Sequence, residues 1–318
     1  MKNVLVEKIR SPDTPVIFYE LIPPAKGADE SVTHAYAECA AELVADCSTS
    51  IDAINLPEIR TERREAERTH PYEPKTDQRE FARQFKATFG NTVELVVNRC
   101  TVYEEWEVQQ TWLEETNETF GIQNIILVGG ESSKVRYPGP SVTEMACSIH
   151  YVYGKTFFCG GITIPTRRHR NPSKDEAHRL LHKGRHGLEY FTSQVLYEPQ
   201  GIQQLLLDYD RLCKAQGEPA KRILLSFAPV SSRKDLSFLR WLGVYVPKDV
   251  ESTLLKANIG IGWRSLKTAC QILNHILAFV EEHQIDVPLG LNVEHITRQN
   301  FELSKQFIEE LGVHYQQT

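Results

Sequence analysis

The chain has 318 residues, of which 41% are hydrophobic and 25% are charged, ordinary values for a globular protein with a sizeable core. This length exceeds that of an average domain, but α/β barrels of this size are routinely single domains. The formal net charge of -6 argues against nucleic acid as the main partner, because nucleic-acid-binding proteins usually carry a basic surface.

The first residues and the cysteines indicate where the protein works. Residues 1–13 contain no hydrophobic stretch long enough for a signal peptide, and no later run approaches the length that spans a membrane. The seven cysteines are scattered and never spaced as C-x-x-C, which favours reduced thiols over a disulfide framework or a zinc site. We therefore expect a soluble cytoplasmic protein.

Residues 15–22, PVIFYELI, form the first predicted strand. The run lacks the polar alternation of a half-exposed strand, which indicates a strand that is buried on both faces, as in parallel sheets. Its one acid, Glu20, lies near the carboxyl end of the strand, where α/β folds gather their chemistry. Such an acid either carries function or pairs with an arginine or a helix end, and the strand alone favours neither.

Helical and strand-like segments alternate along the rest of the chain. Further strands are predicted at 50–57, 93–101, 124–131, 157–165, 190–198, 222–230 and 288–296, and helices at 29–47, 77–90, 104–121, 141–154, 174–187, 199–217, 234–241, 250–257, 262–283 and 300–312. The segment 58–76 is too charged and proline-rich for the core, so we expect a long loop of the kind that carries function.

The number of strand and helix pairs indicates the fold. Regular alternation requires parallel strands joined by right-handed crossovers, and eight such strands close a barrel. We therefore predict a single (β/α)8 TIM barrel domain over residues 1–318. An open doubly wound sheet is the alternative, but no predicted strand is followed by G-x-G-x-x-G, the mark of a dinucleotide crevice.

Polar residues close most of the predicted strands, and in a barrel these positions face one mouth. Serine, cysteine and histidine do not form a nucleophile and base pair there, and the chain lacks H-E-x-x-H, a Walker loop and a metal triad. The chemistry that these residues still allow is acid catalysis, with amide side chains that recognise a polar ring. We expect no metal site. The strand-end residues are Glu20, Asn55, Asn98, Glu131, Thr163, Gln194, Ser226, and Asn292 or Glu294.

Six different short motifs are distributed over almost the whole chain. They are Tyr19-Glu20 before Pro23-Pro24, Glu67-Arg68-Thr69-His70, Gly130-Glu131, the run from Thr192 to Tyr197, Pro229-Val230-Ser231, and Leu291-Asn292-Val293-Glu294. In this order they resemble the methylenetetrahydrofolate reductase family. The first is similar to that family's F-E-x-x-P-P, which holds the catalytic acid, and the fourth to its T-Q-x-x-[FY], whose glutamine binds the pterin.

The resemblance implies a reaction as well as a barrel fold. It implies that 5,10-methylenetetrahydrofolate is reduced to 5-methyltetrahydrofolate with NAD(P)H, and that a carboxyl group protonates the departing amine nitrogen. A carboxyl in an apolar barrel mouth keeps its acid form near neutral pH, because burial disfavours its charged form. The implied residues are Glu20 as catalytic acid and Gln194, Glu131, Asn55, Asn98 and Tyr19 as substrate-binding residues.

The chain departs from the family where the flavin is held. Residues Gly160 to Pro165 lack the tyrosine and histidine of the family's FAD-binding run, and Asn98 stands where a histidine is common. Arg233 replaces an aromatic residue that often stacks on the substrate or nicotinamide. This pattern resembles a divergent, flavin-independent branch. We expect FAD to bind weakly or not at all, with NAD(P)H reducing the folate directly.

The basic run from Thr166 to Arg170 follows the fifth predicted strand. Arg167 and Arg168 are predicted to clamp a phosphate, such as the extra one of NADPH, or the glutamyl tail of the folate. With Arg233 and Thr163 they make up the predicted cofactor-binding set. The alternative is a solvated surface loop, the usual place of a charge run.

Two other classes of function fit the same residues. A methyltransferase or corrinoid-partner barrel would bind methyltetrahydrofolate without exchanging hydride with NAD(P)H. A folate-binding barrel without catalysis would act as a scaffold in a complex. Homo-oligomer formation and protein partners are left open by the sequence.

Overall fold

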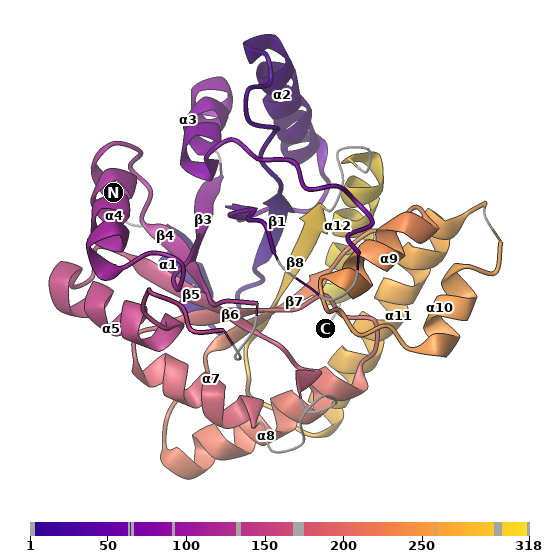
Figure 1. Cartoon of the computed structure of the whole chain (residues 1–318). Coiled ribbons are helices and arrows are strands. Elements are labelled where there is room, and N and C mark those ends of the chain that lie inside the picture. The colour runs from indigo at the N-terminus through magenta and orange to yellow at the C-terminus, as the bar shows by residue number, and fades with distance from the viewer. Residues whose placement is uncertain are drawn as a thin grey trace.

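The computed structural model describes residues 4–62, 64, 67–90, 93–131, 135–167, 175–257, 259–295 and 301–316. Eight strands form a closed barrel in sequence order, and every neighbouring pair is parallel. The helices surround these strands (Figure 1). The predicted (β/α)8 barrel is confirmed, and the open sheet is excluded. Among the described helices, none is both long and apolar enough to cross a membrane.

Each predicted strand is present, although most are shorter than the sequence pattern suggests. The bounds are β1 Ile17–Leu21, β2 Ala53–Leu56, β3 Glu94–Cys100, β4 Asn124–Val128, β5 Phe158–Thr163, β6 Tyr190–Ser193, β7 Arg222–Phe227 and β8 Leu289–His295.

The predicted helices are also present, with two short ones, α9 and α10, inserted between β7 and the long α11. The bounds are α2 Glu30–Asp46, α3 Gln78–Phe89, α4 Trp106–Glu118, α5 Val142–Tyr153, α7 Glu176–Arg185, α8 Gln200–Gln216, α9 Arg233–Trp241, α10 Lys248–Leu254, α11 Ile261–Glu282 and α12 Phe301–Gln316. Capping fixes several starts: the Asp77 side chain accepts from the Arg79 N–H at α3, and Ser232 and Asp235 form a capping box at α9.

A further helix, α1 (Val4–Arg10), was not predicted from the sequence. Its buried residues Leu5 and Ile9 pack in one apolar cluster with inward residues of the strands, among them Phe18 and Tyr190. Because this cluster lies toward the amino ends of the strands, α1 closes the bottom of the barrel.

Alternation along each strand separates the barrel interior from the outer core. Phe18 belongs to the interior cluster, whereas its neighbours Ile17 and Tyr19 belong to the large core between strands and helices. With a side-chain period of two, Glu20 returns to the interior one step nearer the mouth. The same step leads from Ala53 to Asn55, so the apolar base of the barrel gives way to a polar upper layer.

Candidate functional site

Glu20 occupies the interior of the barrel mouth between two polar neighbours. In the sheet register, Glu20 lies opposite Asn55 of β2 on one side and Glu294 of β8 on the other. The Asn55 side-chain amide donates to Glu20 Oε2 at 2.7 Å. Among the described residues, no lysine or arginine forms an ion pair with Glu20. The acid is therefore held by an amide and faces a second acid.

Glu294 is held in a similar way. The side-chain amide of Asn292 donates to Glu294 Oε1 at 3.4 Å and to the Ser226 hydroxyl at 3.0 Å. The sequence left Asn292 and Glu294 as alternatives for the end of the last strand, and the structure brings both to the interior. Two carboxyl groups, each with an asparagine beside it, thus lie on adjacent strands.

Burial sets the protonation of this pair. It raises the pKa of Glu20 well above its ordinary value, the neighbouring charge of Glu294 raises it further, and the hydrogen bond from Asn55 acts in the opposite direction. Burial also raises the pKa of Glu294 to about 7, against a smaller lowering by Ser226. A carboxylic acid is thereby available at the barrel mouth near neutral pH.

The two acids line one cavity of about 120 Å³. Its roof comes from the loop after β2, including Arg60 and Arg68, and from α9, including Trp241. At about 30 Å³ per molecule, this space holds about four waters. A bicyclic ring system requires more room than this cavity offers, so it fits inside completely only if the roof moves outward.

Arg68 attaches the loop to α9 through aromatic contacts. Its guanidinium carbon lies 4.8 Å from the ring centroid of Trp241, 5.3 Å from that of Phe238 and 5.4 Å from that of Tyr72. Its Nε donates to the carbonyl of His70 at 2.8 Å, and it pairs with no carboxylate in the described parts of the chain. Burial lowers the pKa of Arg68, against the raising effects of Glu62 and Tyr72.

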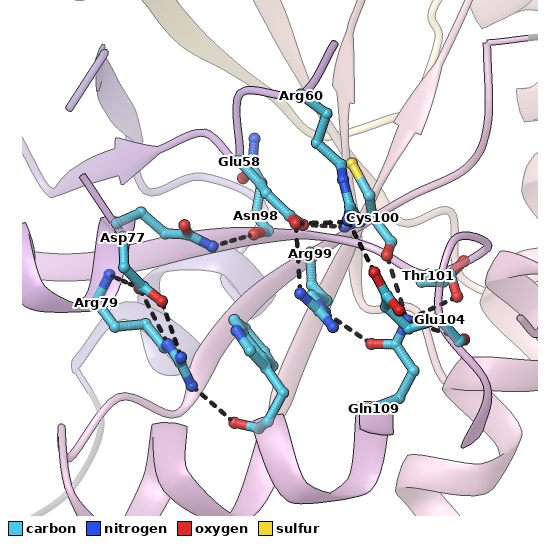
Figure 2. Close-up of polar contacts among 12 residues, drawn as sticks. Glu58, Arg60, Asp77, Arg79, Asn98, Arg99, Cys100, Thr101, Glu104 and Gln109 are labelled. Carbon is cyan, nitrogen blue, oxygen red and sulfur yellow. Dashed lines mark hydrogen bonds and ion pairs between the residues drawn. The ribbon is translucent and has the colours of Figure 1, made fainter. Parts of the chain in front are cut away.

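A polar network fixes the beginning of the same loop to β3 (Figure 2). The Glu58 carboxylate accepts from the backbone N–H of Cys100 at 2.7 Å and from Arg99 at 3.3 Å, and it also pairs with Arg60. Gln78 donates to the backbone carbonyl of Asn98 at 3.0 Å. The start of the loop is therefore held firmly, beside the strand that carries Asn98.

The amide oxygens of the upper layer are incompletely paired. Asn55, Asn98 and Asn292 each have a buried Oδ1 atom without a hydrogen-bond donor among the described residues. The side-chain amide nitrogens of Asn55 and Asn292 already donate to neighbouring side chains, and these hydrogen bonds fix the direction of each amide oxygen. Buried polar atoms of this kind are uncommon and indicate a position where a ligand or water donates.

Glu131 follows β4 and is anchored by Tyr103. The Tyr103 hydroxyl donates to Glu131 Oε2, and the guanidinium of Arg60 lies 4.6 Å from the centre of the Tyr103 ring. Partial burial acts to raise the pKa of Glu131, but hydrogen bonds from Tyr103, Tyr137 and the backbone, together with the charge of Arg64, outweigh it and the pKa is lowered. Glu131 is thus ionised and connected through Tyr103 to the cavity wall.

Gln194 directly follows β6 and is half-buried. Its backbone N–H donates to the carbonyl of Thr163 at 2.8 Å. Because all the strands are parallel, Gln194 lies on the same rim of the barrel as Glu20. Its side chain makes no hydrogen bond to another described residue, and it is not among the residues that line the roofed cavity.

Tyr19 and Thr163 lie on the outer side of the barrel wall. The Tyr19 hydroxyl is 2.9 Å from Nδ1 of His295. Tyr19 packs in the core between strands and helices, and His295 contacts Ser304 and Phe301 of α12. The Thr163 hydroxyl donates to the carboxylate of Glu176 at the start of α7. The structure therefore does not bring these two residues together with Glu20, because adjacent positions on a strand point to opposite faces.

The structure does not place the residues of the predicted phosphate-binding clamp in one group. Arg167 donates to Glu176 at 2.7 Å, so its charge is already balanced by a buried carboxylate. Arg168 lies outside the described residues. Arg233 is the first residue of α9 and is exposed.

Sequence reasoning did not identify the aromatic roof or Tyr103. Phe238 and Trp241 are spaced i, i+3 on α9, a signal for one helix face, but the loop that packs on them lies far away in sequence.

No family model and no curated protein sequence matches the chain. Among solved structures, one similar to this chain is that of an uncharacterized protein from Clostridium thermocellum that binds two copies of 5-methyl-5,6,7,8-tetrahydrofolic acid. The TM-score is 0.79, and the match covers 98% of this chain and 99% of that one at 21% sequence identity. At this identity the likeness concerns the barrel fold.

Proposed function

We propose that the protein reduces 5,10-methylenetetrahydrofolate to 5-methyltetrahydrofolate with NAD(P)H, with Glu20 as the general acid. The carrying observation is a buried carboxyl group at the mouth of the barrel whose acid form is favoured near neutral pH. The motif resemblance and a structural neighbour that binds the methyl form of tetrahydrofolate support the choice of substrate.

The proposed step assigns one proton to the protein and one hydride to the nicotinamide. Glu20 gives its proton to the departing amine nitrogen as the bond between that nitrogen and the methylene carbon breaks. The resulting iminium carbon accepts the hydride, with both electrons, from the reduced nicotinamide. Acid assistance of this kind typically accelerates a reaction about 10²- to 10⁴-fold.

Several side chains of the mouth suit a pterin. The unpaired oxygens of Asn55, Asn98 and Asn292 could accept from the amino and ring N–H groups of the pterin. Gln194, with both donor and acceptor, matches the amide-like edge of the ring, and Glu131 can accept from its amino group. In this proposal the roof moves outward to admit the whole pterin, because the cavity holds only about four waters.

Nicotinamide binding rests on a smaller set of residues. Arg233 is exposed at the start of α9 and forms no ion pair within the described part of the chain, so it is free to contact a phosphate. For FAD, residues Gly160 to Pro165 lack the tyrosine and histidine of the flavin-binding run of the family that the motifs resemble. We therefore propose direct reduction by NAD(P)H.

The test is a spectrum of the purified protein followed by an NAD(P)H oxidation assay. Oxidation at 340 nm should depend on added methylenetetrahydrofolate, and a protein without flavin should not absorb near 450 nm. A yellow protein would reject direct transfer while leaving the reductase proposal standing. Oxidation that does not depend on the folate would reject the proposal itself.

Transfer of a methyl group is the second candidate, because the structural neighbour binds the methylated folate. In that case 5-methyltetrahydrofolate should bind tightly, and NADH should not be oxidised in the presence of methylenetetrahydrofolate at any pH. A scaffold without catalysis would bind the folate and show neither activity, and Glu20→Gln would then change only stability.

A further inference from the structure

Two acids on neighbouring strands face each other across the β1 and β8 pair. Glu20 and Glu294 are register partners, and both point into the barrel and line one cavity. Adjacent strands lie about 4.8 Å apart, so the two carboxyl groups are close enough to interact strongly if both are charged.

The arginines around the pair already interact with other side chains. Arg60 pairs with Glu58 and Glu104, and Arg64 above the roof pairs with Glu62. Arg68 also lines the cavity, but its guanidinium lies over the rings of α9 and forms no ion pair among the described residues.

Two further titratable groups approach Glu294. His295 follows it in β8 but faces the helices, and burial lowers the pKa of His295 to about 4, so the ring is neutral at pH 7. Tyr197, which follows β6, is also buried, and burial raises its pKa, with smaller contributions from Asp235 and Glu294. Neither group supplies a positive charge to balance a second carboxylate.

Each acid has its own amide donor. Asn55 donates to Glu20 at 2.7 Å and Asn292 donates to Glu294 at 3.4 Å. One amide donor per acid stabilises one ionised carboxylate far better than two adjacent ones, because the repulsion between the two carboxylates remains. The site is therefore built for one proton and one negative charge.

We propose that Glu20 and Glu294 form a dyad that shares one proton, in which Glu294 keeps Glu20 in its acid form and returns a proton to it after each turnover. The catalytic part of this inference rests on the proposed reductase function, whereas the sharing of the proton does not. In each cycle, the proton leaves Glu20 for the amine nitrogen, Glu294 takes up a proton from solvent, and Glu294 passes this proton to Glu20, which restores one proton and one negative charge.

Carboxyl titration tests the sharing directly, without any activity. Protein labelled with ¹³C at the glutamate carboxyl carbons is titrated by NMR as wild type, Glu20→Gln and Glu294→Gln. We expect two separate steps in the wild type, sensed by both carboxyl carbons, and a fall of about one pH unit or more in the midpoint of Glu20 in Glu294→Gln. A Glu20 midpoint that does not change when Glu294 is removed would overturn the dyad.

The wild type reports the same coupling through the two-step titration of each carboxyl carbon, so it remains a test if Glu294→Gln fails to fold, and Glu20→Gln assigns the signal of Glu294. Glu189→Gln is the matched control, since Glu189 is a half-buried carboxylate just before β6, at the other end of the barrel, paired with Arg10 and Lys221. This substitution should leave both midpoints of the dyad unchanged.

The catalytic part is tested by the pH profile of folate-dependent NAD(P)H oxidation. A general acid works only while protonated, so Glu294→Gln should move the alkaline limb down by about one pH unit, which is about a tenfold loss of rate above the limb. A uniform loss at all pH values would assign Glu294 a merely structural role. Absence of oxidation in the wild type would reject the reductase function, and the NMR result would still decide the dyad.

Discussion

At the scale of single residues, Glu20 owes its raised pKa to its surroundings. A glutamate at an exposed strand end would be ionised at pH 7, but here an apolar barrel base lies below it and another carboxyl group lies beside it. Within the described part of the chain, its direct hydrogen bond comes from Asn55, which limits the rise of the pKa without cancelling it. The side chain is therefore suited to give up a proton and less suited to bind a metal or a cation.

The first prediction concerns Glu20→Gln. Glutamine keeps the size of the side chain and an oxygen that can accept from Asn55, but it cannot donate an acidic proton. We expect the turnover number to fall about 10²- to 10⁴-fold, while the affinity for 5-methyltetrahydrofolate changes less than about tenfold. Steady-state kinetics and calorimetric binding measure the two quantities. Equal losses in both would remove Glu20 from the acid role.

The second prediction is that the free energy of unfolding depends on pH through the ionisation of Glu294. Its pKa is about 7 in the folded protein and near 4.5 when unfolded, so the folded state binds more protons between these values. The free energy of unfolding contributed by this group is therefore full below pH 4.5 and is lost as the pH rises toward 7. Glutamine cannot ionise, so the Glu294→Gln variant does not lose this stability as the pH rises.

We expect Glu294→Gln to be more stable than the wild type at pH 7.5 by about 1–3 kcal/mol, with the difference shrinking toward pH 4.5. Urea unfolding at a series of pH values measures the difference. A constant difference across this range would contradict the raised pKa of Glu294.

The strand ends were predictable, but the direction of each side chain was not. Because the strands are buried on both faces, their sequences show no polar alternation that would separate inward Glu20 from outward Tyr19. The same ambiguity placed Thr163 in the predicted site, although it faces α7. The pairing of Glu20 with Glu294 depends on barrel closure, which brings the first strand beside the last.

At the scale of elements, the loop after β2 and helix α9 form one unit over the mouth. The sequence predicts the loop and its functional character from its length and charge, but not its packing partner. That partner follows β7 and lies more than a hundred residues further along the chain. Contacts of Arg68 with Phe238 and Trp241 exist only because the barrel places both loops on one rim.

The third prediction is that Arg68→Gln loosens this roof. Cation–π contacts at partly exposed sites contribute about 0.5–1 kcal/mol each, and Arg68 makes three. If opening limits entry, a loss of about 1–2 kcal/mol should speed both association and dissociation of 5-methyltetrahydrofolate about 5- to 30-fold. Stopped-flow tryptophan fluorescence can follow both rates, because Trp241 lies in the roof.

Arg83→Gln is a suitable control for Arg68→Gln, since Arg83 is an exposed arginine on α3 that pairs with Glu80. Its rates should match those of the wild type. Faster dissociation with unchanged association would contradict the role of Arg68 in holding the roof closed. It would show instead that Arg68 binds the folate directly.

The short helix α1 shows a second limit at this scale. Seven residues are too few to form a stable helix in isolation, and the pattern of apolar residues in them is too short to read. Burial of Leu5 and Ile9 against the barrel base supplies the missing stability. Helices of ordinary length, such as α3 and α8, matched their predicted ranges closely because periodicity and end residues agree.

At the scale of the whole molecule, the alternation of strands and helices was enough to predict the closed barrel. Closure divides the interior into an apolar base, filled from below by α1, and a polar mouth. The fold itself does not select a reaction, because this barrel supports many chemistries. In this chain the choice depends on the few interior side chains above the apolar base, which is why stability and function can be perturbed separately.

Arg222 makes this separation testable, and it is the subject of the fourth prediction. It is 2% exposed at the base of the barrel and donates to the carbonyl of Ile9 at 3.1 Å, with further bonds to the carbonyls of Ser11 and Leu289. One side chain thereby joins the end of α1 to β7 and β8. Replacing it removes the donor to the Ile9 carbonyl, and it leaves the carbonyls of Ser11 and Leu289 with only their second donors, Thr14 and Tyr315. A buried carbonyl without a donor costs about 1–3 kcal/mol.

We expect Arg222→Met to lower the free energy of unfolding by about 3–5 kcal/mol. Arg185→Met, which removes an exposed arginine paired with Glu218, should lower it by about 1 kcal/mol or less. Urea unfolding compares the two, and the affinity of the folded variants for 5-methyltetrahydrofolate should equal that of the wild type. Arg222 lies at the opposite end of the barrel from Glu20, so a parallel loss of affinity would mean that base and mouth are coupled and do not act independently.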